Sequence, residues 1–307
     1  MMEEFRMLAP IVVFVYNRLE HARGVIESLS ACTEAKKSEL YIFSDAAKTS
    51  DGAQKVLDVR RYINSEDVRN RFLTVTVIEA KKNKGLANSV ITGVDTVIRE
   101  HGNAIVVEDD NVVSSNFLSY MNGALKFYQN EKKIWSIGGY TLPIAIPKNY
   151  HHDVFMMGRG SSYAWATWLD RWEKIDWDIK DYAEFCRDRK QRKGFNAYGD
   201  DAAAMLDAQM RKGIDSWAIR FFFNAFKNDA WFVLPVVSKV QNIGNDGTGV
   251  HVSKADKRFD TVLDTSGATT RYEMLPIDGR IQQEYQRIFN VPRTMKLKRA
   301  LKRILKK

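Results

Sequence analysis

The chain has 307 residues, of which 45% are hydrophobic and 11% aromatic. This composition excludes a disordered, collagen-like or low-complexity chain and supplies enough apolar material for a sizeable core. The apolar run at residues 9–16 is far shorter than the roughly 20 residues that span a bilayer, so no transmembrane helix is predicted. The N-terminus lacks the basic and apolar regions of a signal peptide, which predicts a cytoplasmic protein. The two cysteines predict neither a disulfide framework nor a metal cluster.

The formal net charge of +9 is concentrated at the C-terminus. Residues 293–307 hold eight Lys and Arg and no acid, and without them the chain has 39 Lys and Arg against 38 Asp and Glu. This nearly neutral body argues against nucleic acid as a partner. Apolar residues of the tail have the spacing of one helix face: Leu297, Ala300, Leu301, Ile304 and Leu305. The tail therefore predicts a basic amphipathic helix on an anionic membrane surface, with a solvated terminus or a helix docked on a partner as alternatives.

Short apolar runs alternate with helical patterns over the first 110 residues. The predicted strands are residues 10–15, 40–43, 73–78 and 104–107. This alternation predicts an α/β fold with a mostly parallel sheet and helices on both faces. Ligands of such sheets bind outside the carboxyl ends of the strands. The polar side chains at those ends are candidates for a site: Arg18, Asp45, Glu108, Asp109 and Asp110.

From about residue 134 shorter apolar pieces mix with helical stretches. Elements are predicted in this half at residues 134–137, 154–157, 202–210, 218–226 and 231–237. The helix at 202–210 has Asp201 as a candidate N-cap, and the helix at 218–226 has Asp215 or Ser216. The spacing of three tryptophans predicts one packed helix face: Trp165, Trp168 and Trp172.

The acidic triplet Glu108-Asp109-Asp110 comes directly after a buried strand. Adjacent carboxylates repel one another unless a cation or the donors of a ligand offset their charge. Hard oxygen ligands of this kind suit Mg²⁺ or Mn²⁺, which bind through one or two carboxylates and substrate phosphates. The alternative is an acidic turn in which Asp110 or Ser114 caps the following helix. The chain has neither the glycine-rich motif of dinucleotide-binding folds nor a P-loop.

The segment VVEDDNVVSSNFLSYMNGAL, residues 106–125, resembles the Glu-Asp-Asp segment of the N-acetylglucosaminyltransferase I family. Members of that family are inverting, metal-dependent nucleotide-sugar glycosyltransferases of the GT-A (Rossmann-like) fold. The order of further segments agrees over roughly residues 9–252, and SYAWATW at 162–168 is similar to the acceptor-side segment of the family. The resemblance implies one domain at 1–258, with a nucleotide-sugar half at 1–133 and an acceptor half at 134–258. Residues 259–307 are interpreted as a loosely attached arm.

Position by position, the resemblance assigns roles on the donor side. Asp110 resembles the direct metal ligand, and Glu108 and Asp109 face the ribose and the sugar. Asp45 resembles the carboxylate that accepts the uracil N3–H, with a turn residue as the alternative. Arg18 is a candidate partner of the base or the diphosphate, with a surface salt bridge as the alternative. Lys84 is a candidate diphosphate ligand in what reads otherwise as a solvated turn.

An inverting transfer also needs a base for the acceptor hydroxyl. The resemblance places this carboxylate near Asp215, which is equally suited to be an N-cap, and the pair Asp200 and Asp201 is the alternative. His251 ends a glycine-rich loop at 241–251, which has the hinge freedom of a closing lid. A histidine there is a candidate ligand of the metal or the phosphate, although a lone histidine is more often structural.

The leading hypothesis is a metal-dependent hexosyl- or N-acetylhexosaminyltransferase that uses a UDP-linked donor with Mn²⁺ or Mg²⁺. The basic tail suggests a lipid-linked oligosaccharide acceptor at the inner face of the cell membrane, in bacterial surface-polysaccharide assembly. The alternatives are a sugar nucleotidyltransferase, whose glycine-rich Arg-Lys loop is missing here, and a non-catalytic membrane-surface binding module.

Overall fold

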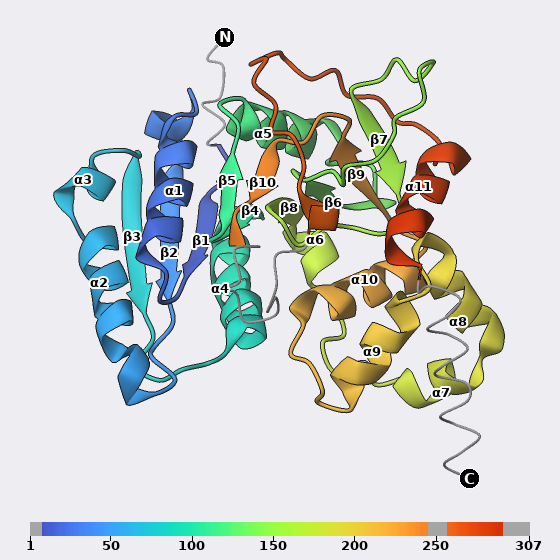
Figure 1. The fold of residues 1–307 in the computed structure, drawn as a ribbon, viewed down its shortest axis with the longest axis horizontal. Coiled ribbons are helices and arrows are strands. Elements are labelled where there is room, and N and C mark those ends of the chain that lie inside the picture. The colour runs from blue at the N-terminus through green and yellow to red at the C-terminus, as the bar shows by residue number, and fades with distance from the viewer. Residues whose placement is uncertain (1–7, 245–256, 291–307) are drawn as a thin grey trace.

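Four parallel strands form one half of the central sheet in the order β3-β2-β1-β4. The computed structural model describes residues 8–244 and 257–290 (Figure 1). These strands are β1 (Ile11–Val15), β2 (Glu39–Ser44), β3 (Thr74–Glu79) and β4 (Asn103–Glu108). Their bounds agree with the sequence prediction to within one residue, because each strand is a short apolar run between helical patterns.

The second half of the sheet extends from β4 in the order β8-β6-β9-β7. Its strands are β6 (Ile134–Gly138), β7 (Val154–Met157), β8 (Trp165–Trp168) and β9 (Trp231–Pro235). Strands β6 and β9 are parallel to each other, whereas β8 and β7 run antiparallel to their neighbours. The predicted α/β class with a mostly parallel, Rossmann-like sheet is therefore confirmed, and two antiparallel strands are added to it.

Helices cover both faces of this sheet, as predicted. One face packs against α1 (Leu19–Ser30), α2 (Ala53–Ile63) and α5 (Phe117–Phe127). The other face packs against α4 (Leu86–His101) and α10 (Trp217–Lys227). Successive residues of a strand point to opposite faces, so Val107 lies in the first core and Val106 in the second. By the same alternation, Glu108 follows on the side of Val106, facing α4 and α10.

A group of shorter helices lies below the right half of the sheet in Figure 1. It consists of α7 (Tyr182–Arg187), α8 (Arg189–Phe195), α9 (Ala202–Met210) and α10. These helices bury a core of their own, centred on Phe185, Phe195, Leu206 and Phe223. Helices α9 and α10 match the predicted ones, whereas α7 and α8 were not predicted. Further short helices are η1 (Ala35–Lys37), η2 (Ser50–Gly52), α3 (Glu66–Arg69), η3 (Asn196–Tyr198) and η5 (Lys257–Phe259).

The tryptophan segment is not a helix face, and this prediction is wrong. Trp165 and Trp168 belong to β8, and only Trp172 lies in a helix, the short α6 (Leu169–Trp172). In a strand, residues three apart point to opposite faces. Trp165 accordingly stacks on Trp217 of α10 at 4.8 Å between ring centroids, whereas the Trp168 indole donates to the Leu125 carbonyl of α5.

The prediction of a loosely attached arm after residue 259 is also wrong for residues 260–290. Lys239 and Asp264 form a buried ion pair that fixes this segment to the residue before β10 (Val240–Asn242). Helix α11 (Gly279–Phe289) buries Ile281 and Tyr285. Buried apolar and ionic groups therefore attach the segment to the domain. The predicted basic helix at 293–307 lies outside the described residues.

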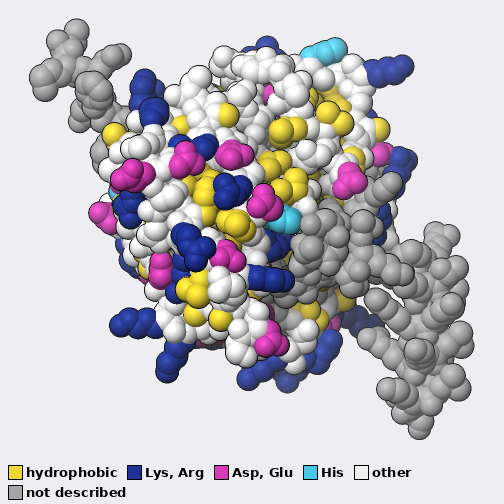
Figure 2. Space-filling view, turned by 60° about the vertical axis from the view of Figure 1, so that its left-hand side comes forward, with side chains coloured by type: hydrophobic (Ala, Val, Ile, Leu, Met, Phe, Trp, Pro, Cys, Tyr) yellow, Lys and Arg dark blue, Asp and Glu magenta, His cyan; other side chains and the backbone are white. Residues whose placement is uncertain are grey.

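Charges of both signs are mixed on one face of the domain. Figure 2 shows Lys and Arg side chains interspersed with Asp and Glu on the face it presents. Within residues 8–244 and 257–290, no helix is both long and apolar enough to cross a membrane.

Candidate functional site

The ends of β1, β2 and β4 meet at one edge of the sheet because these strands are parallel. In the register of the sheet, Phe14 lies level with Glu108 and Val15 with Ser44. The polar residues that follow each strand are therefore neighbours in space, although about 90 positions separate the first from the last. This edge holds the group that we call the acidic corner: Arg18, Glu108, Asp109 and Asp110.

Arg18 joins the two aspartates of the acidic corner. Its Nη2 donates to Asp109, in a short contact, and to Oδ2 of Asp110 at 2.9 Å. Burial alone would lower the pKa of Arg18, but the two carboxylates raise it, so the guanidinium is charged. Part of the positive charge that the acidic triplet requires thus comes from the chain itself.

Glu108 is partly buried, and its surroundings differ from those of the two aspartates. Its carboxyl group accepts a hydrogen bond from the Trp217 indole at 3.3 Å. Burial, followed by the nearby charge of Asp110, raises the pKa of Glu108 to about 8. Both causes favour the protonated form of Glu108, which reduces the repulsion within the acidic triplet.

Asp110 is held from a second side by the segment around β10. Strand β10 pairs with β5 (Asn111–Val113), and the Ile243 amide donates to the Asp110 carbonyl at 2.8 Å. The Asn242 side chain donates to Oδ1 of Asp110 at 3.0 Å. A Cβ atom added to Gly244 would lie 2.4 Å from Oδ2 of Asp110, so this close approach requires glycine.

The contacts of Asn242 and Gly244 with Asp110 were not predicted from the sequence, because the segment containing them was interpreted as a glycine-rich loop with hinge freedom. The pairing of β10 with β5 is a tertiary contact with no local sequence signal. The alternative in which Asp110 or Ser114 caps α5 is wrong. The N-cap position of α5 is Asn116, without a side-chain cap, and the Ser114 hydroxyl donates to Asn116.

Asp45 has the contacts of a turn anchor. Its two carboxylate oxygens accept from the backbone amides of Ala46, Lys84 and Gly85 at 2.8 to 3.1 Å. The Asn83 side chain adds a further hydrogen bond at 3.1 Å. These bonds fix the turn that leads into α4, where Gly85 has a φ of +77°. The Lys84 side chain is exposed. The roles of Asp45 and Lys84 toward a nucleotide stay predictions.

Asp215 lies beside this turn. A Cβ atom on Gly85 would be 3.4 Å from Oδ2 of Asp215. Asp215 is about half exposed, and its nearest cation is Arg220 at 3.8 Å. Ser216, and not Asp215, caps α10, because its hydroxyl accepts from the Ile219 amide. Since Trp217 bonds to Glu108, the start of α10 brings Asp215 to the same edge as the acidic corner.

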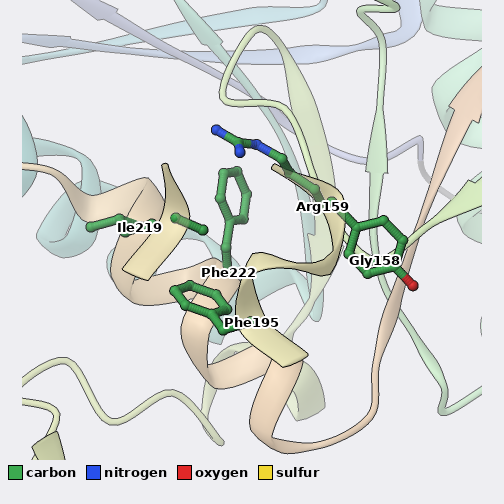
Figure 3. Close-up of a pocket in the computed structure, with 7 residues that line it drawn as sticks. Gly158, Arg159, Phe195, Ile219 and Phe222 are labelled. Atoms are coloured by element: carbon green, nitrogen blue, oxygen red, sulfur yellow. The ribbon is translucent and has the colours of Figure 1, made fainter. Parts of the chain in front are cut away.

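The alternative base, Asp201, has a different neighbourhood. Arg159 binds both of its carboxylate oxygens, at 2.6 and 2.9 Å. Asp201 is the N-cap residue of α9 by position, but it makes no side-chain cap. Arg159 also borders a small hollow whose lining includes Phe195 and Phe222 (Figure 3). Neither Asp215 nor any residue of the acidic corner lines that hollow.

Asp110 is the more exposed aspartate of the acidic corner and the candidate ligand of a divalent metal ion. Within the described residues, no three His, Cys, Asp or Glu side chains gather around a common point as an all-protein metal site would require. Asp110, with 18% of its side chain exposed, offers one accessible carboxylate. One carboxylate completed by substrate phosphates is a usual arrangement for Mg²⁺. The second predicted ligand, His251, lies outside the described residues.

No protein-family model matches the chain, and no curated protein matches its sequence. Among solved structures, residues 1–349 of S. aureus TarS are similar at a TM-score of 0.44 and 12% identity, covering 76% of this chain and 60% of that one. The mannosyltransferase PcManGT from Pyrobaculum calidifontis, in complex with GDP-Man and Mn²⁺, is similar at a TM-score of 0.40 and 12% identity, covering 72% of this chain and 69% of that one. Likenesses this distant do not define substrates or site residues here.

Proposed function

We propose that this chain is an inverting glycosyltransferase that moves a sugar from a nucleoside diphosphate to a carbohydrate acceptor. The observation that carries the proposal is the acidic corner, with Asp215 beside it, at the carboxyl edge of the parallel strands. Transfer from a diphosphate needs a place that compensates the charge of the leaving group and, on the opposite side of the sugar, a base. This edge offers groups for both tasks.

On the donor side, each residue has a task that its environment supports. Asp109 is buried with Arg18 and orients it. Glu108, whose pKa is raised, donates in its protonated form a hydrogen bond to a ribose or sugar oxygen. Asp110 would hold Mn²⁺ or Mg²⁺ together with the phosphates, and a bound ion supplies positive charge to the departing diphosphate.

On the acceptor side, Asp215 is the proposed base. It is exposed enough to meet an acceptor hydroxyl and would take the proton of that hydroxyl as its oxygen attacks the sugar. No covalent intermediate on the chain is needed in a single displacement. Asp201 is less suited to this role because Arg159 occupies both of its oxygens.

The finer identity of the substrates rests on the sequence. A UDP-linked donor, transfer of a hexosyl or N-acetylhexosaminyl group, and a lipid-linked glycan acceptor in bacterial surface-polysaccharide assembly are the proposed specifics. Attachment to the inner face of the membrane through residues 293–307 is proposed because that tail combines basic residues with one apolar helix face in its sequence pattern.

The test combines binding with turnover. We expect UDP with Mn²⁺ to raise the melting temperature of the protein and Asp110→Ala to remove that rise. A matched control is Asp95→Ala, which removes an exposed ion pair with Arg99 on α4 and should leave the rise intact. A panel of nucleotide sugars should then give metal-dependent turnover. A response to a nucleoside triphosphate and a sugar phosphate instead would favour a nucleotidyltransferase.

A further inference from the structure

The guanidinium group of Arg18 uses only part of its hydrogen-bonding capacity. Nη2 serves both aspartates, whereas Nη1 is shielded from solvent and has no hydrogen-bond partner within residues 8–244 and 257–290. A buried N–H group without an acceptor is costly, so such groups are rare in folded proteins. An orphaned donor at the edge where a diphosphate is proposed to bind needs an acceptor oxygen.

The same guanidinium competes with any cation for Asp110. Its Nη2 lies against Oδ2 of Asp110, while Asn242 holds Oδ1. Both oxygens of this carboxylate are therefore engaged when no ligand is present. Arg18 also binds Asp109, whose side chain is more buried than that of Asp110, so Asp110 is the aspartate that a ligand from solvent reaches more easily. A metal ion that binds Asp110 must share or replace its bond to Arg18.

Resting on the proposed function, we propose that Arg18 is a positioning residue that couples the binding of the metal ion to the binding of the nucleotide. Without nucleotide, Arg18 holds Asp110 and weakens its affinity for a divalent ion. A phosphate oxygen of the nucleotide accepts from Nη1, which draws the guanidinium toward the phosphate while Asp109 keeps it in the site. Asp110 is then available to the ion.

This coupling has a required symmetry. If nucleotide raises the affinity for the ion by some factor, the ion raises the affinity for nucleotide by the same factor. Couplings between ligands typically amount to roughly 5- to 150-fold. An ion pair with no part in nucleotide binding would instead leave the enhancement by nucleotide unchanged when Arg18 is replaced.

The test measures the binding of Mn²⁺ alone and in the presence of UDP, by electron paramagnetic resonance of the free ion. Wild-type protein should bind Mn²⁺ weakly, and UDP should tighten that binding by about tenfold or more. In Arg18→Met, Mn²⁺ alone should bind more tightly than in wild type, and the enhancement by UDP should shrink. Asp110→Ala gives the binding of Mn²⁺ to UDP in solution, which is subtracted.

Arg18→Lys provides a second variant, because loss of the arginine leaves Asp109 buried without a partner and could unfold Arg18→Met. Lysine keeps the charge but lacks the fork that reaches a carboxylate and a phosphate together, so the enhancement should again fall. Wild-type enhancement in both folded variants, or in Arg18→Lys alone if Arg18→Met is unfolded, would overturn the inference and leave the proposed function standing. Wild-type protein that binds neither Mn²⁺ nor UDP, with GDP tested in parallel, would overturn both.

Discussion

Asp45 and Asp110 follow β2 and β4, the two strands that flank β1, and lie at the same edge of the sheet, yet their surroundings differ. Asp45 accepts mainly from backbone amides of its own loop and of the turn before α4. Asp110 accepts from two side chains, Arg18 and Asn242, that come from distant parts of the chain. Backbone donors are fixed by the fold, whereas side-chain donors can move when a ligand arrives. The type of hydrogen-bond donor around a carboxylate, backbone or side chain, therefore distinguishes a structural anchor from a candidate metal ligand.

Asp264 shows that a side-chain partner alone does not identify a ligand site. It also has a side-chain partner, the ammonium group of Lys239, but its side chain is only 6% exposed, against 18% for Asp110. Burial would raise the pKa of Asp264, but hydrogen bonds from Lys239, Asn116 and Ser266 hold it below its usual value. A side-chain partner thus indicates a ligand site only where the carboxylate also reaches solvent.

The largest effect is expected for Asp110→Ala in the transfer reaction. Loss of the carboxylate should lower kcat/KM by about 1,000-fold or more, roughly 4 kcal/mol of transition-state stabilisation. Stability should change little, because Arg18 keeps Asp109 as its partner. The measurement is metal-dependent turnover together with a thermal melt. Turnover within tenfold of wild type would show that Asp110 is not part of the donor site.

Asp264→Asn should lower the free energy of unfolding by about 3 kcal/mol, because it leaves the Lys239 ammonium group buried without its carboxylate. The lowered pKa of Asp264 adds a pH dependence. Its contribution to stability is present above the unfolded pKa of about 3.9 and is lost as the pH falls toward the folded value. Urea unfolding at pH 7 and pH 3 should show that the difference in free energy of unfolding between wild type and variant is smaller at pH 3. Equal differences at both pH values would contradict this account.

Asp45→Ala should lower the free energy of unfolding by about 1 to 3 kcal/mol, because several amides of the turn before α4 lose their acceptor. The KM for the donor should rise only modestly if Asp45 is an anchor. A rise in the donor KM of a hundredfold with unchanged stability would instead identify Asp45 as the acceptor of the nucleobase. Chemical denaturation and donor titration on the same preparation distinguish the two results.

Gly244→Ala should have the smallest effect of the four. The added methyl group would meet the Asp110 carboxylate, so we expect about tenfold weaker apparent affinity for Mn²⁺, within the range known for disturbed ligand supports. The matched control is Gly279→Ala, because Gly279 has an ordinary backbone conformation and open space around it. Gly267 is unsuitable because its φ is positive. Gly279→Ala should leave the affinity for Mn²⁺ unchanged.

The first half of the fold could be predicted from the sequence because its strands and helices are separate, locally patterned segments. In the second half most elements could be predicted, but their arrangement could not, because β8 is inserted between β4 and β6 and its tryptophans repeat at a spacing that was interpreted as a helix face. Residues 260–290 are attached through the ion pair of Asp264 with Lys239, which lies 25 positions before Asp264. No local sequence pattern reveals that contact.

At the candidate site, too, the positions of the charged residues could be predicted and their contacts could not. The positions of Arg18, Asp45 and the acidic triplet at the carboxyl edge follow from strand ends alone. Their partners do not, because Arg18 and Asp109 are 91 positions apart and Asn242 and Asp110 are 132 apart. Sequence analysis accordingly found the charged groups but missed that the chain supplies its own cation to them.

A crystal structure of the protein with UDP and Mn²⁺ addresses the central claim most directly. We predict a diphosphate at the acidic corner, with the ion on Asp110 and a phosphate oxygen accepting from Nη1 of Arg18. Nucleotide bound elsewhere, with Asp110 still held by Arg18 and Asn242, would contradict the assignment of this edge as the donor site.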